Sequence, residues 1–306
     1  RVGGLVGWRF QSLAALQEAA RIKPSQPMRN EYAAALTRSD FGPDRFVNLG
    51  PTNRDWMTVT FDAKVERAAR GFRNGEVSVM DLAGRVPPRT LPGFGERALN
   101  LNFSADGAWL VVGYDSRVRV WEIASAQPLF ELDTPVSLNL LRVTDLSEDK
   151  TKLLVWDENR GLFLFDLGSP PQARRRRVTD RLDAFALHPK GTNLAVVRGN
   201  TCEILDEVTL ETRRRFALPR TNATEHAAWS PRGRWLAGCG DSWVWILDTE
   251  TGRSLDLEGP GEFGREVMFS ADGQTLMAHG WGQGHTRVWN VWTGRLLIST
   301  FSGYVR

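Results

Sequence analysis

Cysteine is scarce in this chain. Only Cys202 and Cys239 occur among 306 residues. Two thiols are too few for the disulfide framework of a small secreted domain, or for a metal site built from cysteines. We expect both to be reduced structural thiols, because a small, apolar free cysteine is usually buried.

Long apolar runs and an excess of one charge are also missing. No stretch approaches the roughly 18 consecutive apolar residues of a membrane-spanning helix, so no membrane contact is expected for this segment. The start, Arg1–Gly4, has neither an initiator Met nor a signal-peptide core, so we expect a piece of a longer protein. The 39 basic and 36 acidic residues give a net charge of only +3, which argues against a nucleic-acid partner. Localisation stays unknown: cytoplasmic is the default, and tethering to a membrane kinase would make the segment extracytoplasmic.

Tryptophan and glycine, by contrast, are abundant. The chain has 12 Trp and 29 Gly, against 3 Tyr and 5 Met. With 42% hydrophobic and 25% charged residues it has the composition of a globular protein. Many Gly and Trp in a chain of this size indicate repeated short strands joined by tight turns.

A short turn motif recurs along the chain. It reads Phe-Ser-Ala-Asp-Gly from Phe103 and Phe269, and Trp-Ser-Pro-Arg-Gly from Trp229. The copies begin at Phe61, Phe103, Leu146, Leu187, Trp229 and Phe269, so the steps between them are 42, 43, 41, 42 and 40 residues. Self-similarity at such a period indicates a repeat architecture.

Each copy continues in the same order. An apolar run follows the turn, and then a segment that alternates apolar and polar residues, as in Arg117–Trp121. Period-two alternation between turn residues predicts a half-buried strand. The alternating segments end at the pairs Met80-Asp81, Trp121-Glu122, Phe165-Asp166, Leu205-Asp206, Leu247-Asp248 and Trp289-Asn290. Four short strands per copy form a sheet that buries both faces only beside its siblings, so we predict an all-β propeller.

The pattern resembles WD40 repeats, which have four strands per unit and a similar period. The resemblance covers roughly residues 45–306. The six pairs named above occupy the place of the family's Trp-Asp pair, although none reads Trp-Asp; Trp156-Asp157 is out of phase. The family's turn Asp matches Asp115 and Asp241, while Asn74, Asn159, Gly199 and Gln283 replace it elsewhere. The Gly-His pair is absent, with Gly93-Phe94 and Gly259-Pro260 in its place, so the family's His–Asp network should be incomplete. The first copy looks degenerate, because Val65–Ala69 carries charge where an apolar strand is expected.

The closure of the ring is open at this point. Phe46–Leu49 is in phase with the last strand of a repeat, while the sixth copy already has its own last strand near Leu296–Phe301. We favour a truncated seven-bladed ring over a six-bladed ring with Phe46–Leu49 as decoration, because an open ring exposes strand edges. We place the propeller at residues 43–306 and a helical linker at residues 1–42.

The linker shows helical spacing. Phe10, Leu13, Leu16 and Ala20 fall on one helix face, with Ser12 as the expected N-cap and Lys23-Pro24 as the stop. A second run, Asn30–Leu36, is rich in helix formers. These segments resemble the helical stretch before the propeller in bacterial serine/threonine kinases that carry C-terminal WD40 repeats. No kinase motif lies in this chain, so any kinase domain would lie upstream.

Candidate catalytic and metal residues are few. His279 and His285 flank Trp281 in one expected loop, but zinc needs three or four protein ligands and no third one follows. No Gly-x-Ser-x-Gly nucleophile motif occurs, and the serines of the repeated turns recur with the fold. We therefore expect no catalytic residue, no metal and no cofactor.

Two arginine runs, Arg174–Arg177 and Arg213–Arg215, fall where the outermost strand of a blade is expected. An anionic partner is one interpretation. We favour the other, that charged outer strands prevent edge-to-edge pairing. Among the tryptophans, Trp109, Trp121, Trp235 and Trp289 occupy repeated strand positions and should pack, whereas Trp56 and Trp281 lie near the loops of one rim.

These observations predict a non-catalytic protein-interaction scaffold that presents propeller loops to a protein or peptide. The alternatives are a regulatory or sensor module of a bacterial serine/threonine kinase, with the kinase domain as a partner in the same parent chain, and a propeller hydrolase or lactonase. By analogy with the family, the rim formed by the loops between outer and inner strands, and between second and third strands, should bind. Its candidate residues are Asn53, Trp56, Arg73, Phe94, Arg97, Asp115, Arg160, Arg198, Asp241, Trp281 and His285.

Overall fold

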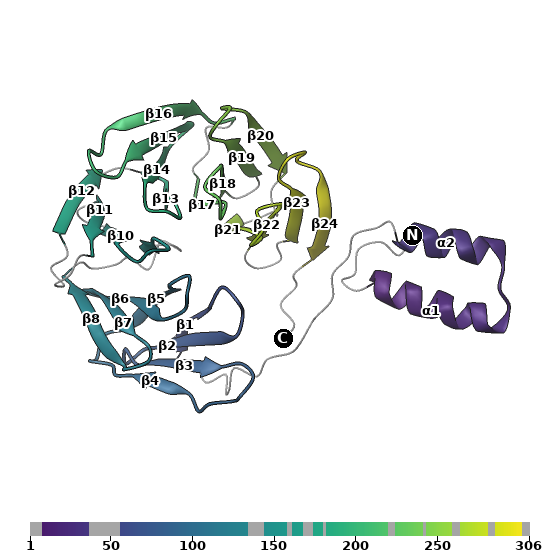
Figure 1. Ribbon diagram of the computed structural model, residues 1–306, viewed down its shortest axis with the longest axis horizontal. Coiled ribbons are helices and arrows are strands. Elements are labelled where there is room, and N and C mark those ends of the chain that lie inside the picture. Colours follow the sequence, from purple (N-terminus) through teal and green to yellow (C-terminus); the bar gives the residue numbers. More distant parts are fainter. Residues whose placement is uncertain are drawn as a thin grey trace.

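The computed structural model describes residues 8–36, 56–133, 144–157, 161–167, 174–179, 182–219, 224–240, 243–258, 264–280 and 285–301. Two helices precede six four-stranded antiparallel sheets, which follow one another around a ring (Figure 1). In each sheet the four strands are neighbours in chain order. The predicted all-β propeller with four-stranded blades is confirmed.

The sheets are numbered here in chain order. Sheet 1 contains β1 (Trp56–Phe61), β2 (Arg67–Phe72), β3 (Val77–Asp81) and β4 (Arg89–Leu91). Sheet 2 contains β5 (Ala98–Phe103), β6 (Trp109–Tyr114), β7 (Val118–Glu122) and β8 (Gln127–Leu132). Sheet 3 contains β9 (Thr144–Leu146), β10 (Lys152–Asp157), β11 (Gly161–Asp166) and β12 (Arg174–Thr179).

The second half of the ring has the same composition. Sheet 4 contains β13 (Ala184–Leu187), β14 (Asn193–Arg198), β15 (Thr201–Asp206) and β16 (Thr212–Ala217). Sheet 5 contains β17 (His226–Trp229), β18 (Trp235–Gly240), β19 (Trp243–Asp248) and β20 (Ser254–Glu258). Sheet 6 contains β21 (Gly264–Phe269), β22 (Thr275–Gly280), β23 (His285–Asn290) and β24 (Leu296–Phe301).

The repeated motif forms the turn between the first and second strands. In sheet 2 the Ser104 hydroxyl donates to Asp106 Oδ1 at 2.6 Å and accepts from the Trp109 N–H at 2.9 Å. Gly107 has a φ of 65°, a left-handed conformation that glycine adopts without strain. Sheets 3 and 6 repeat the same serine–aspartate bond. The interpretation of these residues as turn formers is confirmed.

The six apolar–polar pairs end the third strand of each sheet, as predicted. Asp248 shows why a polar residue suits this place. Its Oδ1 accepts from the Glu250 N–H at 3.0 Å, and its backbone oxygen accepts from the Gly252 N–H at 2.8 Å. The polar residue therefore closes the turn that leads into the outer strand.

Among the described residues, five apolar clusters hold the ring together, and each joins two consecutive sheets. The predicted packing role of the strand tryptophans is confirmed for Trp121, Trp235 and Trp289, which are buried. Trp109 is half-buried and packs on Phe130, with ring centroids 6.0 Å apart. The apolar side chains of one sheet thus pack closely against those of the next.

Sheet 1 differs from the sequence-based expectation. The segment Val65–Ala69 is not a charged strand, because β2 begins only at Arg67 and its Ala68 and Ala69 are fully buried. Val65 lies in the turn with a φ of 52°. The prediction was wrong by two residues, since the turn of this copy lacks the glycine that marks the register in sheets 2, 4, 5 and 6.

The N-terminal segment forms two adjacent helices, α1 (Trp8–Ile22) and α2 (Gln26–Leu36), outside the ring (Figure 1). Pro24 follows the end of α1, as expected, because proline cannot continue a helix. Ser12 is not the N-cap: the helix begins at Trp8, so Ser12 lies within it. Among the described residues, neither helix has the length and apolarity needed to cross a bilayer. The predicted boundary at residues 42–43 and the segment Phe46–Leu49 lie outside the described residues.

Candidate interaction site at the propeller rim

Five of the predicted rim residues have described side chains: Arg73, Phe94, Arg97, Asp115 and Arg198. Asn53, Arg160, Asp241 and Trp281 lie outside the described residues, and so do the side chains of Trp56 and His285, which begin β1 and β23. Four of the five belong to loops at the junction of sheets 1 and 2. Arg198 is apart from them, at the end of β14 in sheet 4.

The loop from sheet 1 to sheet 2 packs directly on the turn between β2 and β3. The Gly95 N–H donates to the Asn74 carbonyl oxygen at 3.1 Å. A Cβ at Gly93 would lie 2.5 Å from that same oxygen, and Gly75 has a φ of 86°. Only glycine fits both places. The exposed Arg73 and the half-buried Phe94 therefore lie on two loops that pack against each other at the rim.

Arg97 and Asp115 form the main ion pair of this junction. The Arg97 Nη2 lies 2.5 Å from Asp115 Oδ1, and the Arg97 backbone N–H donates to Asp115 Oδ2 at 2.8 Å. The Arg97 guanidinium holds the pKa of the Asp115 carboxyl below its ordinary value, against the opposing effect of burial. In this chain, which has no Gly-His pair here, the partner of the turn aspartate is therefore an arginine and not a histidine. Asp115 is a structural anchor of the loop.

Phe94 lies in an aromatic and cationic cluster. Its ring centroid is 4.5 Å from that of Tyr114, and the Arg119 guanidinium lies 3.8 Å from the Phe94 ring centroid. Burial raises the pKa of Tyr114 to about 12, so this phenol stays protonated at neutral pH. Such cation–π contacts fix the orientation of both partners.

Sequence reasoning missed the charges that support this cluster. Arg117 pairs with Glu96 at 3.1 Å and with Glu131 at 2.7 Å, and Arg119 pairs with Glu131 at 2.5 Å. Glu96 also accepts from the Ser116 hydroxyl at 2.6 Å. The signal was present: Arg119 is a polar member of the alternating strand β7, and Arg117 directly precedes that strand, next to the predicted loop.

Arg198 makes contacts of a different kind. Its guanidinium donates to Glu203 and to the Thr179 hydroxyl, the latter at 2.9 Å. Glu203 also pairs with Arg215 at 2.5 Å. Arg198 thus belongs to a network inside sheets 3 and 4, away from the junction of sheets 1 and 2.

The arginine runs lie on the outer strands β12 and β16, as predicted. Arg213 pairs with Asp206, Arg214 donates to the Thr249 carbonyl oxygen of sheet 5, and Arg215 pairs with Glu203. These partners support the structural interpretation for Arg213–Arg215. The side chains of Arg174–Arg176 lie outside the described residues, while that of Arg177 is exposed.

The histidines are placed differently from the expectation. His279 is not in a loop: it lies in β22, and its Nδ1 is 3.1 Å from the Thr286 hydroxyl of β23. His285 begins β23. Within the described part of the chain, no group of three or more His, Cys, Asp or Glu side chains could hold a metal. Cys202 and Cys239 are free and buried, and burial raises the pKa of Cys202 to about 12.

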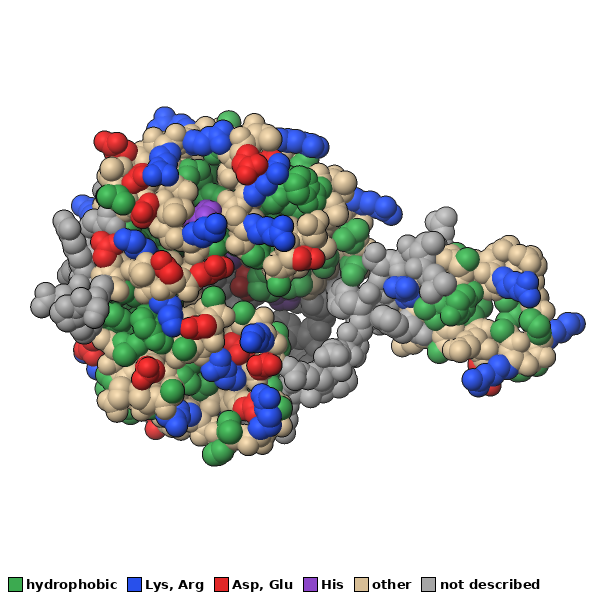
Figure 2. Space-filling view, viewed as in Figure 1, with side chains coloured by type: hydrophobic (Ala, Val, Ile, Leu, Met, Phe, Trp, Pro, Cys, Tyr) green, Lys and Arg blue, Asp and Glu red, His purple; other side chains and the backbone are tan. Residues whose placement is uncertain are grey.

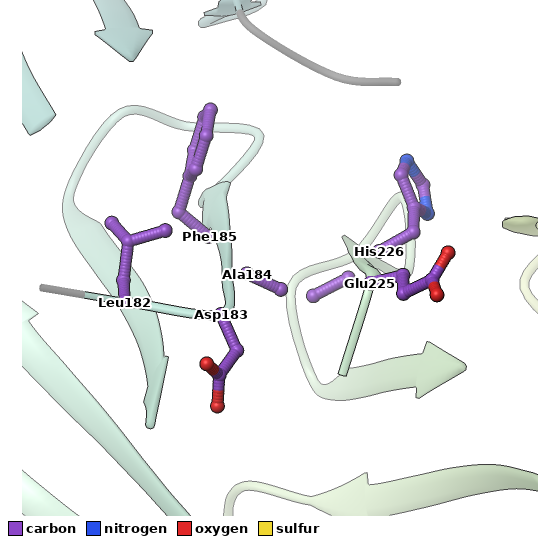
Figure 3. A pocket seen from close by; sticks show the side chains of 7 residues that line it. Leu182, Asp183, Ala184, Phe185, Glu225 and His226 are labelled. Atoms are coloured by element: carbon purple, nitrogen blue, oxygen red, sulfur yellow. The ribbon is translucent and has the colours of Figure 1, made fainter. Parts of the chain in front are cut away.

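A small pocket lies between the first strands of sheets 4 and 5 (Figure 3). Asp183 and Glu225, which precede β13 and β17, contribute its two carboxylates. Figure 3 shows these two side chains pointing in different directions. Asp183 Oδ2 accepts from the Gly199 N–H at 2.6 Å, which ties it to the neighbouring turn. The pair therefore lacks the convergent geometry of an acid–base or metal site.

The surface of the ring in Figure 2 mixes both charges. Lysine and arginine side chains alternate with aspartate and glutamate side chains over the visible face. This agrees with the small net charge of +3. The structure thus shows no single-sign field on that face that would attract a polyanion.

Comparison with known proteins supports the architecture. The family model described as "WD domain, G-beta repeat" matches residues 85–122. The serine-threonine kinase receptor-associated protein of Gallus gallus is 24% identical over 200 residues, which cover 64% of this chain and 55% of that protein. The match thus spans about half the length of this curated relative.

A solved structure has a similar fold. The β-propeller domain of Cps50 (Swd1) from Myceliophteria thermophila superposes with a TM-score of 0.65 at 17% identity, covering 84% of this chain and 89% of that one. The resemblance of the linker to bacterial kinases is not addressed by these matches and stays a prediction. The repeat pattern, the six radially arranged sheets and these matches together establish that the chain has the all-β propeller fold of the WD40 type.

Proposed function

We propose that this chain is a non-catalytic protein-interaction scaffold, and that the rim at the junction of sheets 1 and 2 binds a peptide or a loop of a partner protein. The observation that carries this proposal is the cluster of Phe94, Arg117 and Arg119 beside the exposed Arg73. Aromatic and arginine side chains contribute much of the binding energy at protein interfaces.

The rigidity of this rim supports the proposal. Arg97 and Arg117 are fixed by Asp115, Glu96 and Glu131, and the loop below them is held by glycine contacts. Side chains that are already ordered lose little conformational entropy when a partner binds. The avian relative is named for association with a serine-threonine kinase receptor, which is consistent with a protein partner.

Selection of a displayed random peptide library on the purified chain tests the proposal. Selected peptides should bind the unmodified chain in a fluorescence polarisation titration. Arg73→Glu should weaken that binding about tenfold, because it reverses an exposed charge on the rim, equivalent to about 1.4 kcal/mol.

Arg232→Glu is the matched control, since Arg232 is also an exposed arginine, in the turn between β17 and β18 on the opposite side of the ring. Binding to this variant should equal that of the unmodified chain. Loss of binding in Arg232→Glu with no change in Arg73→Glu would assign the interaction to the opposite side and contradict the proposal.

A regulatory role beside a serine/threonine kinase is a second candidate. It is supported by helices α1 and α2, which lie where the resemblance to the bacterial kinases predicts a helical stretch. Incubating the natural polypeptide with ATP and a generic protein substrate tests it. Phosphate transfer that changes when the propeller is removed supports this role, and absence of any transfer rejects it.

A further inference from the structure

Trp292 lies in the turn between β23 and β24 of sheet 6. It is 44% exposed, which makes it the most exposed tryptophan among the described side chains. The same place in a repeat is three positions after the apolar residue of the apolar–polar pair. There the other described turns have Ala83 in sheet 1, Ala124 in sheet 2, Val208 in sheet 4 and Glu250 in sheet 5. The turn therefore forms without an aromatic side chain, and the repeat itself does not require Trp292.

The indole of Trp292 is held in place although it is exposed. Its ring centroid lies 5.1 Å from that of the buried Trp235, edge to face, and the Arg234 guanidinium lies 4.7 Å from the Trp292 ring centroid. Arg234 is fixed in turn by Asp248 at 2.7 Å and by Glu250 at 3.4 Å. An ordered, exposed indole loses little conformational entropy when a partner covers it.

This turn lies on the rim opposite to Phe94. In each antiparallel sheet, the turns after the first and third strands lie at one end. The turn after the second strand and the loop to the next sheet, which carries Phe94, lie at the other end. The turn of Trp292 also lies close to sheet 5, because a Cβ added at Gly294 would be 3.1 Å from Leu257 Cδ2 of β20. Trp292 therefore marks the junction of sheets 5 and 6.

Two exposed arginines accompany Trp292 on this rim. Arg253 and Arg295 occupy the same place in the turns that lead into β20 and β24. Among the described residues neither forms an ion pair, whereas Asp248 and Glu250 are both engaged by Arg234. The same place holds Val86 in sheet 1, Gln127 in sheet 2 and Glu211 in sheet 4. Within the described turns, this unpaired positive charge is specific to sheets 5 and 6.

We propose that Trp292, Arg253 and Arg295 form a second docking surface, the Trp292 patch, which binds an acidic segment of a partner protein. An apolar side chain of that segment covers the exposed part of the indole, and its carboxylates pair with the two arginines. Tryptophan and arginine are the side chains that contribute most often to binding hot spots. Complementary charge then selects an acidic partner and speeds its association.

A basic segment fits this surface less well, because the carboxylates near it are already bonded. Arg234 holds Asp248 and Glu250. In the adjoining turn of sheet 6, the exposed Asp272 accepts from the Ser270 hydroxyl at 2.6 Å and from the Gln274 N–H at 2.9 Å. A cation would have to break these bonds, whereas a carboxylate meets arginines that have no partner in the described part of the chain.

Subtractive peptide selection tests this chemistry. A displayed random library is first depleted on the Trp292→Ser variant, and its unbound members are then selected on the unmodified 306-residue chain. Depletion removes peptides that bind elsewhere, including those that bind the rim near Phe94. Success or failure here is therefore independent of the site at sheets 1 and 2. The selected sequences should be rich in aspartate and glutamate and should contain an apolar residue.

Point variants then measure the role of charge with a selected peptide, in a fluorescence polarisation titration. Arg253→Gln and Arg295→Gln should each weaken binding several-fold and reduce the loss of affinity with added salt. Val208→Ser is the matched control, since Val208 holds the place of Trp292 in sheet 4 and is 67% exposed. This variant and Arg73→Glu, on the other rim, should bind as the unmodified chain does.

Several results would overturn the proposal. If no peptide survives depletion and binds the unmodified chain, the patch is not a docking surface. Enrichment of basic or uncharged sequences would reject the acidic partner. Unchanged binding in both arginine variants would do the same. Loss of binding in Val208→Ser or in Arg73→Glu would place the peptide on another part of the ring.

Discussion

Sheets 5 and 1 are built from the same repeat but differ in burial. Every residue of β18 and β19 in sheet 5 is buried. In sheet 1, three of the six residues of β2 are only half-buried, and Phe61 and Val65 are exposed. Among the described residues, sheet 5 shares apolar clusters with sheets 4 and 6, whereas sheet 1 shares one with sheet 2 alone. The burial of a blade therefore depends on its neighbours as much as on its own sequence.

The turn between the first and second strands also differs between sheet 1 and sheet 2. In sheet 2 the turn uses Ser104, Asp106 and Gly107. In sheet 1, the buried Asp62 replaces the serine: it accepts from the Glu66 N–H at 2.8 Å and pairs with Arg67 at 3.1 Å. This holds Val65 in a left-handed conformation at the position of the glycine. The substituted turn keeps its shape, with the strain carried by one exposed residue.

The largest effect should come from the centre of sheet 5. Trp245→Ala removes a fully buried indole whose N–H donates to the Thr224 hydroxyl at 3.3 Å. We expect a loss of about 3–5 kcal/mol in the free energy of unfolding, measured by urea denaturation. Met80→Ala at the half-buried face of sheet 1 is the comparison and should cost far less. Equal losses would contradict the difference in burial between the two sheets.

An effect of opposite sign should come from the turn of sheet 1. Val65→Gly relieves a β-branched residue held at a φ of 52°. Strain of this kind costs on the order of 1–3 kcal/mol, and glycine adds about 0.5–1 kcal/mol of unfolded-state entropy. The variant should therefore be more stable by about 1 kcal/mol, seen as a higher urea midpoint. A lower midpoint would show that the Val65 side chain makes a stabilising contact.

A smaller, pH-dependent effect should come from His188 between sheets 4 and 5. Burial lowers the pKa of His188 from its ordinary value of 6.5, and the nearby Lys190 lowers it further. The folded state binds the proton less tightly than the unfolded state. The contribution of neutral His188 to the free energy of unfolding is therefore fully present above pH 6.5. It falls as the pH drops through 6.5 toward the folded-state pKa.

Denaturation midpoints between pH 8 and pH 4 check this sign. His188→Gln keeps a polar side chain beside Trp229, whose ring lies 5.0 Å from that of His188. The variant should lose the part of the pH dependence that begins near 6.5. A stability that rises as the pH falls through this window would reverse the assignment.

The smallest effect should come from Met268 in β21 of sheet 6. Met268→Ala should change the free energy of unfolding by less than about 0.5 kcal/mol, because this side chain is 43% exposed. Ile246→Ala, at a fully buried position in β19 of sheet 5, should cost about 2–5 kcal/mol. A large loss in Met268→Ala would mean that this side chain is covered.

The predicted rim was only partly recoverable from sequence. The loops that carry Phe94, Arg97 and Asp115 could be located, because each follows a strand whose period is visible in the chain. The Arg97–Asp115 pair could not be predicted, since the repeat suggested a missing histidine rather than an arginine in its place. The clustering of Phe94 with Arg119 also depends on how two loops and a strand meet. The binding role of these residues stays a prediction.

Errors in the sequence interpretation arose where local signals were weak. Ser12 resembled an N-cap because serine is favoured there, but the helix continues upstream to Trp8. His279 was expected in a loop, but it lies in β22, where buried and half-buried residues alternate. In sheet 1 the register was misread because Val65 replaces the glycine that marks the turn in sheets 2, 4, 5 and 6.

The sequence by itself determined the four-stranded unit, its period, its turns and the polar residue at the end of each third strand. These are local properties: period-two alternation and turn hydrogen bonds involve residues only a few positions apart. Only the tertiary structure decided which faces are covered and which arginines are paired. Burial of a face depends on contacts between residues about one repeat apart, as between Lys150 and Asp106. The arginine pairs join different strands and loops, as between Arg97 and Asp115, and no local pattern encodes these contacts.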